Sequence, residues 1–239
     1  MIKHVFLDLD DTILDFHRAE RVAISSTFSE VGCPADDATL NRYSEINRSC
    51  WQRLEAGEWT REEVLVGRFR ILFDELSVDA DPERTQAIYE DRLCNYHFFM
   101  DGAERLLDEL YGRYKLYIAS NGTARVQDSR IAASGIAKYF DGIFVSQRVG
   151  ADKPSAAFFE RVFSEIEGFD KNSAIIVGDS LTSDILGGRN AGILTCYFNP
   201  GGRKPASYIF PDYEIASLDQ LLPLLQGINK LSPESINEV

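Results

Sequence analysis

The sequence is poor in the residues that build disulfide scaffolds, membrane spans and nucleic-acid surfaces. Its 239 residues include four cysteines, with no CxxC pair and no histidine at zinc-ligand spacing, which argues against a disulfide framework and a zinc finger. No apolar run approaches the roughly 18 residues of a membrane-spanning helix. The first apolar stretch is too short and too acidic for a secretory signal. We therefore expect a cytoplasmic protein that does not bind membranes.

Basic residues are also scarce. Lysine and arginine number 25 against 38 aspartates and glutamates, which gives a net charge of −13. This balance argues against a nucleic-acid partner, because the phosphate backbone selects for lysine and arginine. A small anionic substrate stays compatible with it if a metal or a local cation offsets the field. The sequence does not distinguish a monomer from a homodimer, and we expect one of the two.

What the chain does contain is ordinary for a globular protein, with 44% hydrophobic and 26% charged residues. Short apolar runs bounded by polar turns recur, and their Val, Ile, Phe and Tyr content predicts buried strands. These runs are residues 4–9, 114–119, 142–145, 173–177 and 194–198. Stretches with helical periodicity lie between most of them. The alternation predicts an α/β fold with a doubly wound parallel sheet, similar to a Rossmann fold.

One long segment breaks this alternation. Residues 16–99 show helical periodicity and no convincing strand. A crossover between parallel strands needs only about a dozen residues, so the segment is too long for that purpose. We predict an inserted all-helical cap domain at 16–99, an α/β catalytic core at 1–15 and 100–230, and a frayed tail at 231–239.

Polar residues follow each strand that should line the crevice of the sheet. Ligands of open α/β sheets bind beyond the carboxyl ends of the strands, so these positions form a candidate site. Asp8, Asp10 and Thr12 follow the first predicted strand, and Ser120 and Asn121 follow the second. Further along the chain, Lys153 comes after the third strand, and Asp179 and Asp184 come after the fourth.

These residue types point to phosphate chemistry. Asp8 and Asp10 are two residues apart, so their side chains leave the same face of an extended chain. Clustered carboxylates repel each other unless they share a cation, and an all-oxygen set suits Mg²⁺. Lys153 is the one cation among the strand-end groups and suits a phosphate oxygen. Together they indicate phosphoryl transfer through an acyl phosphate.

In this order the residues resemble the four motifs of the haloacid dehalogenase-type phosphohydrolases. The motifs are DLDDT at 8–12, an apolar strand ending in Ser120, Lys153 before Pro154, and GDSLTSD at 178–184. The place of the insert is similar to that of the helical C1 cap of subfamily I. The string GDSLTSDILGGRNAG followed by TCYFNPGG resembles the branch of pyrimidine 5′-nucleotidases.

The resemblance implies a two-step reaction. Asp8 would be the nucleophile that takes the phosphoryl group. Asp10 would first act as the acid for the leaving alkoxide and then as the base for the attacking water. The carboxylates of Asp8 and Asp179, with the backbone carbonyl of Asp10, would hold Mg²⁺.

The resemblance also implies roles for the residues around this centre. Ser120, Asn121 and Lys153 would bind the transferring phosphoryl group. Asp184 would orient Lys153 or a metal-bound water. Thr12 would brace the loop that carries the two aspartates.

The function implied is a Mg²⁺-dependent phosphomonoester hydrolase that acts through an aspartyl phosphate, with pyrimidine nucleoside 5′-monophosphates as substrates. Sugar phosphates and phosphoglycolate stay open as alternative substrates, and a phosphomutase is a further alternative. A 2-haloacid dehalogenase needs neither a metal nor a second acid, so Asp10 and Asp179 argue against one. A phosphate-sensing binding module would lack the nucleophile or a metal acid, and this sequence has both.

Overall fold

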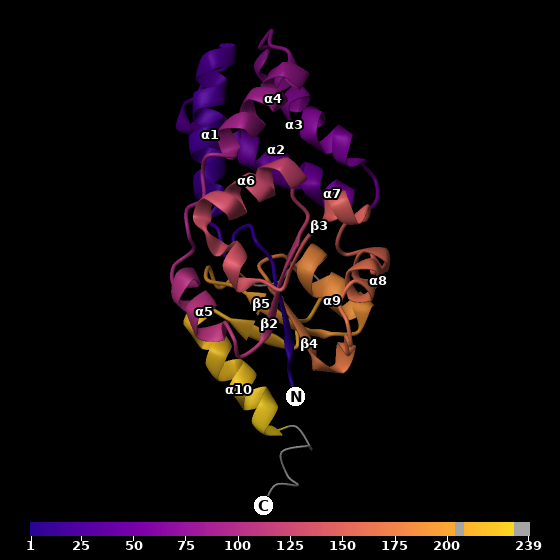
Figure 1. The fold of residues 1–239 in the computed structure, drawn as a ribbon. Coiled ribbons are helices and arrows are strands. Elements are labelled where there is room, and N and C mark those ends of the chain that lie inside the picture. The colour runs from indigo at the N-terminus through magenta and orange to yellow at the C-terminus, as the bar shows by residue number, and fades with distance from the viewer. Residues whose placement is uncertain (204–207, 232–239) are drawn as a thin grey trace, which may run out of the picture. The chain divides into compact units, whose positions relative to one another are not determined.

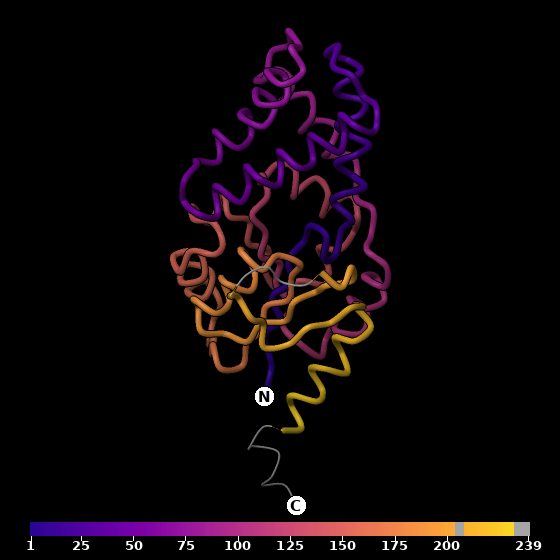
Figure 2. The backbone as a smooth tube through the Cα atoms, turned by 180° about the vertical axis from the view of Figure 1, so that it is seen from behind, coloured from indigo at the N-terminus to yellow at the C-terminus, as the bar shows by residue number. Residues whose placement is uncertain are grey.

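The computed structural model describes residues 1–203 and 208–231 (Figure 1). The tail predicted at 231–239 lies outside the described residues from position 232 onward. The amino-terminal segment lies beside the last helix, α10 (Leu221–Leu231), in both views (Figures 1 and 2), and the Ile2 N–H donates to the Asn229 side chain. No helix in the described part of the chain is long and apolar enough to cross a membrane.

Among the described residues, six strands form one parallel sheet. They are β1 (His4–Leu7), β2 (Lys115–Ser120), β3 (Gly142–Val145), β4 (Ala174–Gly178), β5 (Leu194–Phe198) and β6 (Tyr213–Ile215). Their order is β3-β2-β1-β4-β5-β6, and every neighbouring pair is parallel. The predicted doubly wound parallel sheet is thus confirmed. β6 is an addition to the predicted strands, because three residues are too few to show a period.

The strand order reverses between β1 and β4, and this switch point is where a binding crevice is expected. The chain builds outward from β1 through β2 and β3 on one side, and through β4, β5 and β6 on the other. Ligands of doubly wound sheets bind at such a switch point, outside the carboxyl ends of the strands. Leu7 pairs with Ile118 of β2 and with Val177 of β4, so the three strands end within a few residues of one another.

Helices cover this sheet and bury its apolar strands. They are α5 (Ala103–Leu110), α7 (Ser146–Val149), α8 (Ala156–Ser164), α9 (Leu186–Ala191) and α10, with the short turns η1 (Ile136–Tyr139), η2 (Lys171–Ser173), η3 (Leu181–Ile185, π-helical) and η4 (Leu218–Gln220). Phe158 and Phe159 of α8 join one hydrophobic cluster with Phe6 of β1 and Ile176 of β4. Because helices bury these strands, the strands are almost continuously apolar.

Gly188 of α9 lies so close to the sheet that the structure leaves no room for a side chain. A Cβ atom there would stand 2.5 Å from Ile176 Cγ2 and 2.7 Å from Thr195 Cγ2. We expect Gly188→Ala to lower the free energy of unfolding by about 1–3 kcal/mol, because overpacking forces neighbours to shift. Urea unfolding measures this. Gly227→Ala is the matched control, since no atom of the described residues lies within 4 Å of that Cβ, and it should raise stability by about 0.5–1 kcal/mol. Equal effects at both sites would contradict the packing argument.

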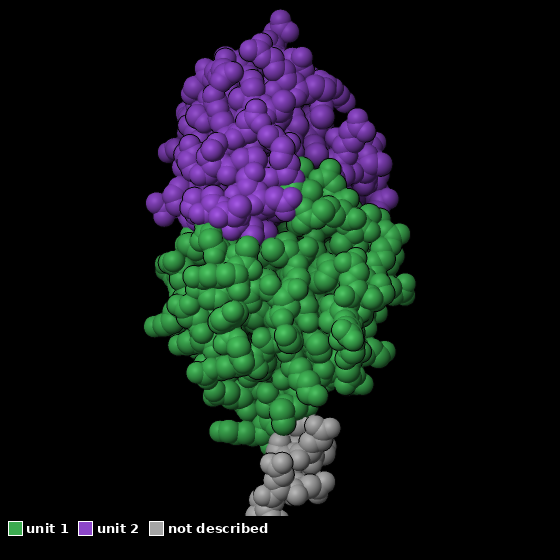
Figure 3. Space-filling view, in the orientation of Figure 1, with its two compact units in different colours: residues 1–15, 99–124, 134–239 green, residues 16–98, 125–133 purple. Residues whose placement is uncertain are grey.

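The described chain divides into two compact units (Figure 3). The first comprises residues 1–15, 99–124 and the described part of 134–239, and it contains the sheet. The second comprises residues 16–98 and 125–133. It is built from α1 (Phe16–Val31), α2 (Asp37–Glu55), α3 (Arg61–Leu76), α4 (Pro82–Leu93) and most of α6 (Ala124–Ser134). We call it the helical unit.

The helical unit includes α6, which the sequence analysis grouped with the core at 100–230. Two sets of contacts account for this difference. Val126 lies in the hydrophobic cluster of the helical unit. Arg125 forms ion pairs with Glu90 and Asp91 at the end of α4. Residues 125–133, a few positions after the end of β2, therefore pack with the other helices of the helical unit.

A buried polar network ties the first three helices of this unit together. Glu20 and Arg68 are each only 2% exposed. Asn47 joins them, because its Nδ2 donates to Glu20 Oε1 (2.6 Å) and its Oδ1 accepts from Arg68 Nη1 (2.7 Å). Buried polar groups that are satisfied in this way fix one arrangement of the helices that carry them.

Candidate active site

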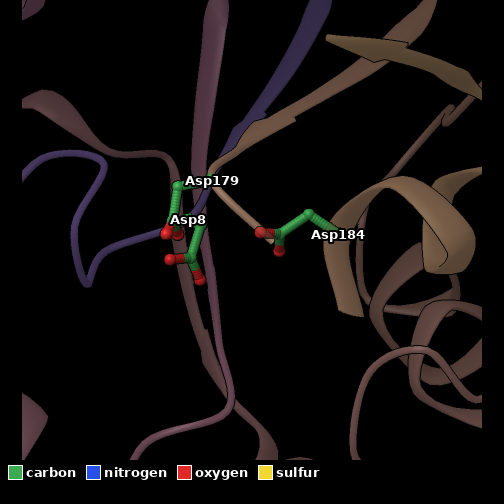
Figure 4. A group of neighbouring side chains, drawn as sticks. All are labelled: Asp8, Asp179 and Asp184. Carbon is green, nitrogen blue, oxygen red and sulfur yellow. The ribbon is translucent and has the colours of Figure 1, made fainter. Parts of the chain in front are cut away.

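Three aspartates meet at the carboxyl edge of the sheet, at the switch point between β1 and β4. Asp8 follows β1, Asp179 follows β4, and Asp184 lies in the η3 turn. One carboxylate oxygen from each lies within 4.8 Å of those of the other two (Figure 4). The Asp8 N–H donates to Val177 O (2.9 Å), which continues the β1–β4 ladder by one residue. The sheet itself therefore positions Asp8 against the end of β4. All three residues belong to the sheet-containing unit.

A tight turn after β1 carries Asp10 and Thr12. The Leu14 N–H donates to Leu9 O (2.8 Å), and the Asp11 N–H donates to Leu14 O (2.7 Å). Asp11 takes a φ of 55°, a left-handed conformation that aspartate tolerates better than most residues. Thr12 is completely buried, and its hydroxyl has no hydrogen-bond partner in the described part of the chain. Any bracing by Thr12 would therefore come from packing.

Lys153 reaches this cluster from the loop between α7 and α8. Its side chain is 1% exposed. The Nζ donates to Asp8 Oδ1 (2.7 Å), to Asp184 Oδ1 (2.6 Å) and to the backbone carbonyl of Ala119 (2.5 Å). An ammonium has three N–H donors, so these three acceptors fix its position. The structure thus brings together the nucleophile candidate, the lysine and Asp184.

The charges at the site leave an excess of negative charge. Burial raises the pKa of Asp8 to about 8, with the charge of Lys153 opposing the shift and those of Asp184 and Asp10 adding to it. Burial also raises the pKa of Asp179 well above its usual range, and the charges of Asp11 and Asp8 raise it further. Buried carboxylates with raised pKa values are stabilised by a bound cation. An all-oxygen, net negative set of this kind fits Mg²⁺.

At Lys153 the neighbouring charges together affect the pKa more strongly than burial does. Burial alone would lower the pKa of Lys153, but the charges of Asp184 and Asp8 outweigh it and raise the pKa. Lys153 therefore stays protonated over the whole physiological range. It supplies a permanent positive charge beside the nucleophile candidate.

Asp184 is held in place from two sides. Its Oδ2 accepts from the Ser180 N–H (3.1 Å), and its Oδ1 accepts from Lys153. A Cβ atom on Gly178 would lie 2.1 Å from Asp184 Oδ2, so the carboxylate occupies the space that a side chain at 178 would fill. The glycine that ends β4 is therefore part of the site. The sequence analysis missed this role, which depends on the folded position of η3.

The end of β2 supplies the remaining predicted residues. Ser120 is 1% exposed, and its Oγ accepts from the Gly122 N–H (3.1 Å). Asn121 Nδ2 donates to Lys153 O (2.8 Å), and Asn121 Oδ1 accepts from the Lys153 N–H (2.8 Å). Sequence reasoning missed this pairing and also the Ala119 carbonyl, because a backbone contact carries no signal in residue type. The structure thus joins Asn121 to the loop that carries Lys153, with Ser120 beside it in the chain.

Comparison with known proteins gives consistent matches along the chain. A family profile described as haloacid dehalogenase-like hydrolase matches residues 2–192. The HAD-hydrolase YfnB of Bacillus subtilis is 37% identical over 228 residues, covering 95% of this chain and 97% of that protein. The pyrimidine 5′-nucleotidase PynA of Streptococcus pneumoniae is 37% identical over 224 residues, covering 93% and 94%. A crystal structure of YfnB bound to magnesium superposes with a TM-score of 0.89, covering 94% of this chain and 98% of that one.

Proposed function

The chain belongs to the haloacid dehalogenase-like hydrolase family, and on that premise we propose that it is a Mg²⁺-dependent phosphatase of pyrimidine nucleoside 5′-monophosphates. The observation that carries the proposal is the contact between Asp8 and Lys153 within the cluster of three aspartates. It combines a carboxylate nucleophile, a permanent positive charge and a place for a divalent cation. Phosphoryl transfer needs these three features.

In the first step an oxygen of Asp8 attacks phosphorus, and the bond between phosphorus and the leaving alkoxide breaks. The ion pair with Lys153 favours the ionised form of Asp8, which is the form that attacks. Asp10 gives its proton to the leaving oxygen. In the second step Asp10 takes a proton from water, the water oxygen bonds to phosphorus, and the Asp8–phosphorus bond breaks. Inorganic phosphate and the original Asp8 carboxylate result.

The metal would be held by the Asp8 and Asp179 carboxylates and by the backbone carbonyl of Asp10. When bound, Mg²⁺ neutralises these carboxylates and withdraws charge from the phosphoryl oxygens. Asp184 accepts from Lys153 at 2.6 Å, so we assign it to holding the lysine. We propose that Ser120 and Lys153 bind the phosphoryl group, while Thr12, which is buried, packs inside the turn that carries Asp10.

The proposed substrate, a pyrimidine nucleotide, rests on sequence similarity to a relative. The chain is 37% identical to a pyrimidine 5′-nucleotidase over nearly the full length of both proteins. We propose that the helical unit acts as a cap that selects the leaving group. Several of its aromatic side chains, Trp51, Trp59, Tyr96 and Phe98 among them, are partly buried against its hydrophobic core, and aromatic rings are the side chains that stack on a base.

A panel of phosphomonoesters tests the proposal. Phosphate release would be measured with UMP, dUMP, dTMP, AMP, phosphoglycolate and several sugar phosphates, each with Mg²⁺ and with a chelator. We expect turnover that needs Mg²⁺, with the pyrimidine monophosphates leading. Mg²⁺-dependent turnover led by a sugar phosphate or phosphoglycolate would overturn the nucleotide assignment and keep the phosphatase. The absence of turnover with every ester would contradict the phosphatase itself.

Mg²⁺ should also stabilise the fold. Binding to the folded state alone at 100 times the Kd adds about 2.7 kcal/mol, which raises the Tm of a chain of this size by roughly 5–10 °C. Thermal unfolding with and without Mg²⁺ measures the shift. Asp179→Asn should lose most of it, because the variant removes one of the clustered carboxylates. An equal shift with potassium chloride at the same ionic strength would contradict a specific site.

A further inference from the structure

The reciprocal hydrogen bonds between Asn121 and Lys153 carry an inference that rests on the proposed phosphatase function and deepens it. We propose that Asn121 is a positioning residue, which acts on the reaction by fixing the main chain of Lys153. The resemblance to the family implied instead that Asn121 binds the phosphoryl group. In the positioning role, Asn121 affects the reaction rate only through Lys153. In the binding role, it affects the rate without Lys153.

The geometry of the pair is specific to asparagine. Nδ2 donates to Lys153 O at 2.8 Å, and Oδ1 accepts from the Lys153 N–H at 2.8 Å. A side-chain amide carries one donor group and one acceptor, as a peptide group does, so it can pair with both backbone groups of one residue. Aspartate offers only acceptors and would turn one toward the Lys153 carbonyl. Alanine offers neither group.

Lys153 needs such a partner because regular structure does not hold it. It lies in the loop between α7 and α8, outside every helix and strand. The next residue is Pro154, which has no N–H to donate. The Asn121 side chain therefore acts on Lys153 as a neighbouring strand would. It joins the end of β2 to this loop.

The position of the Lys153 main chain matters because the ammonium can move only a little before it loses its hydrogen bonds. Nζ reaches three acceptors at 2.5–2.7 Å, on two aspartates and on the Ala119 carbonyl. Ala119 and Asn121 lie on the same stretch of chain, one residue either side of Ser120. This stretch thus holds Lys153 at both ends, with the carbonyl of Ala119 at Nζ and the amide of Asn121 at the backbone. Displacing a reacting group by about 1 Å can cost about 100-fold in rate.

A double-mutant cycle tests the inference. Asn121→Ala, Lys153→Met and the double variant would be compared with the wild type in two measurements: kcat/KM on the best ester of the panel, and the Kd of inorganic phosphate with Mg²⁺ present. We expect Asn121→Ala alone to lower kcat/KM by roughly 10–100-fold. In the Lys153→Met background the same change should alter either quantity by less than about twofold, because effects that pass through one residue are not additive.

The same loss from Asn121→Ala in both backgrounds would overturn the inference, because direct binding of the phosphoryl group does not need Lys153. A merely structural role would also persist in both backgrounds, together with an equal fall in Tm. Asn121→Asp is the conservative variant: it keeps the size and one acceptor, and it should rescue no activity relative to Asn121→Ala. If a variant fails to fold, Asn121→Ser or Lys153→Gln takes its place in the cycle.

Failure of this inference is separable from failure of the proposed function. A wild type that hydrolyses no ester contradicts the phosphatase, whatever the variants do. A wild type that hydrolyses an ester, combined with additive effects in the cycle, contradicts only the positioning role.

Discussion

Replacing Asp8 with asparagine should abolish phosphate release, with a loss of at least about 1,000-fold in kcat. An amide does not attack phosphorus, and asparagine also removes the charge that pairs with Lys153 at 2.7 Å. Phosphate release by the variant and the wild type would be measured at saturating Mg²⁺ and ester. Asp79→Asn makes the same chemical change at an exposed position of the helical unit, and it should leave turnover unchanged.

The fold of the Asp8→Asn variant should survive, which separates lost chemistry from lost structure. Burial raises the pKa of Asp8 from 3.8 to about 8. For an acid with a raised pKa, the stabilising contribution is complete below pH 3.8 and is lost as the pH rises through about 8. At neutral pH without metal, folding must therefore either protonate Asp8 or bury its charge, and both cost stability that a neutral asparagine does not lose. The Tm of the variant without Mg²⁺ should equal or exceed that of the wild type.

Two results would contradict this account of Asp8. Turnover by Asp8→Asn within about tenfold of the wild type would show that another group attacks phosphorus. A variant that is both inactive and clearly less stable without Mg²⁺ would show that Asp8 serves the fold.

Replacing Lys153 with methionine should lower kcat/KM by roughly 100–1,000-fold and the free energy of unfolding by about 3 kcal/mol. Methionine is apolar and unbranched, so the change removes the ammonium while keeping most of the side chain. Without the ammonium, three buried acceptors lose a donor at 2.5–2.7 Å, namely Asp8, Asp184 and the Ala119 carbonyl. Initial rates and urea unfolding measure the two effects.

Lys153→Arg is the matched control, because it keeps the charge and changes the geometry. The planar donors of a guanidinium do not meet three acceptors arranged around one ammonium. We expect an activity between those of the wild type and Lys153→Met, with most of the stability retained. Wild-type kinetics in Lys153→Met would contradict the role of this lysine, and equal losses in both variants would show that geometry matters more than charge.

Much of the sheet could be predicted from the sequence because its signals are local. Each of the five longer strands is a short apolar run, and the alternation of strands with helices predicts the parallel, doubly wound arrangement. The helical unit was harder to describe. Glu20 and Arg68 are charged residue types that usually face solvent on a helix, yet each is 2% exposed. Asn47 bonds to both of them, and Ser44 and Gln86 supply further hydrogen bonds. A single sequence does not show which charged residues find partners on another helix.

In the candidate site, too, the sequence predicts some features and leaves others to the structure. The sequence places Asp8, Asp179, Asp184 and Lys153 at the ends of parallel strands, which meet at one edge, and the structure brings these four residues together, while their roles stay predictions. The resemblance to the haloacid dehalogenase-like hydrolases is confirmed by the match of the family profile over residues 2–192. The contacts that set the geometry could not be predicted. The Ala119 carbonyl, the space at Gly178 and the pairing of Asn121 with Lys153 all depend on backbone positions, which residue types do not encode.

The central claim is that the phosphoryl group passes through Asp8, and trapping that group tests it most directly. The wild type would be quenched in acid during turnover of its best ester and digested, and the peptides analysed by mass spectrometry. We predict a phosphoryl group on the peptide that contains Asp8, formed and lost with the kinetics of turnover and absent from Asp8→Asn. An unmodified Asp8 throughout active turnover, or a phosphoryl group on another residue, would contradict the account.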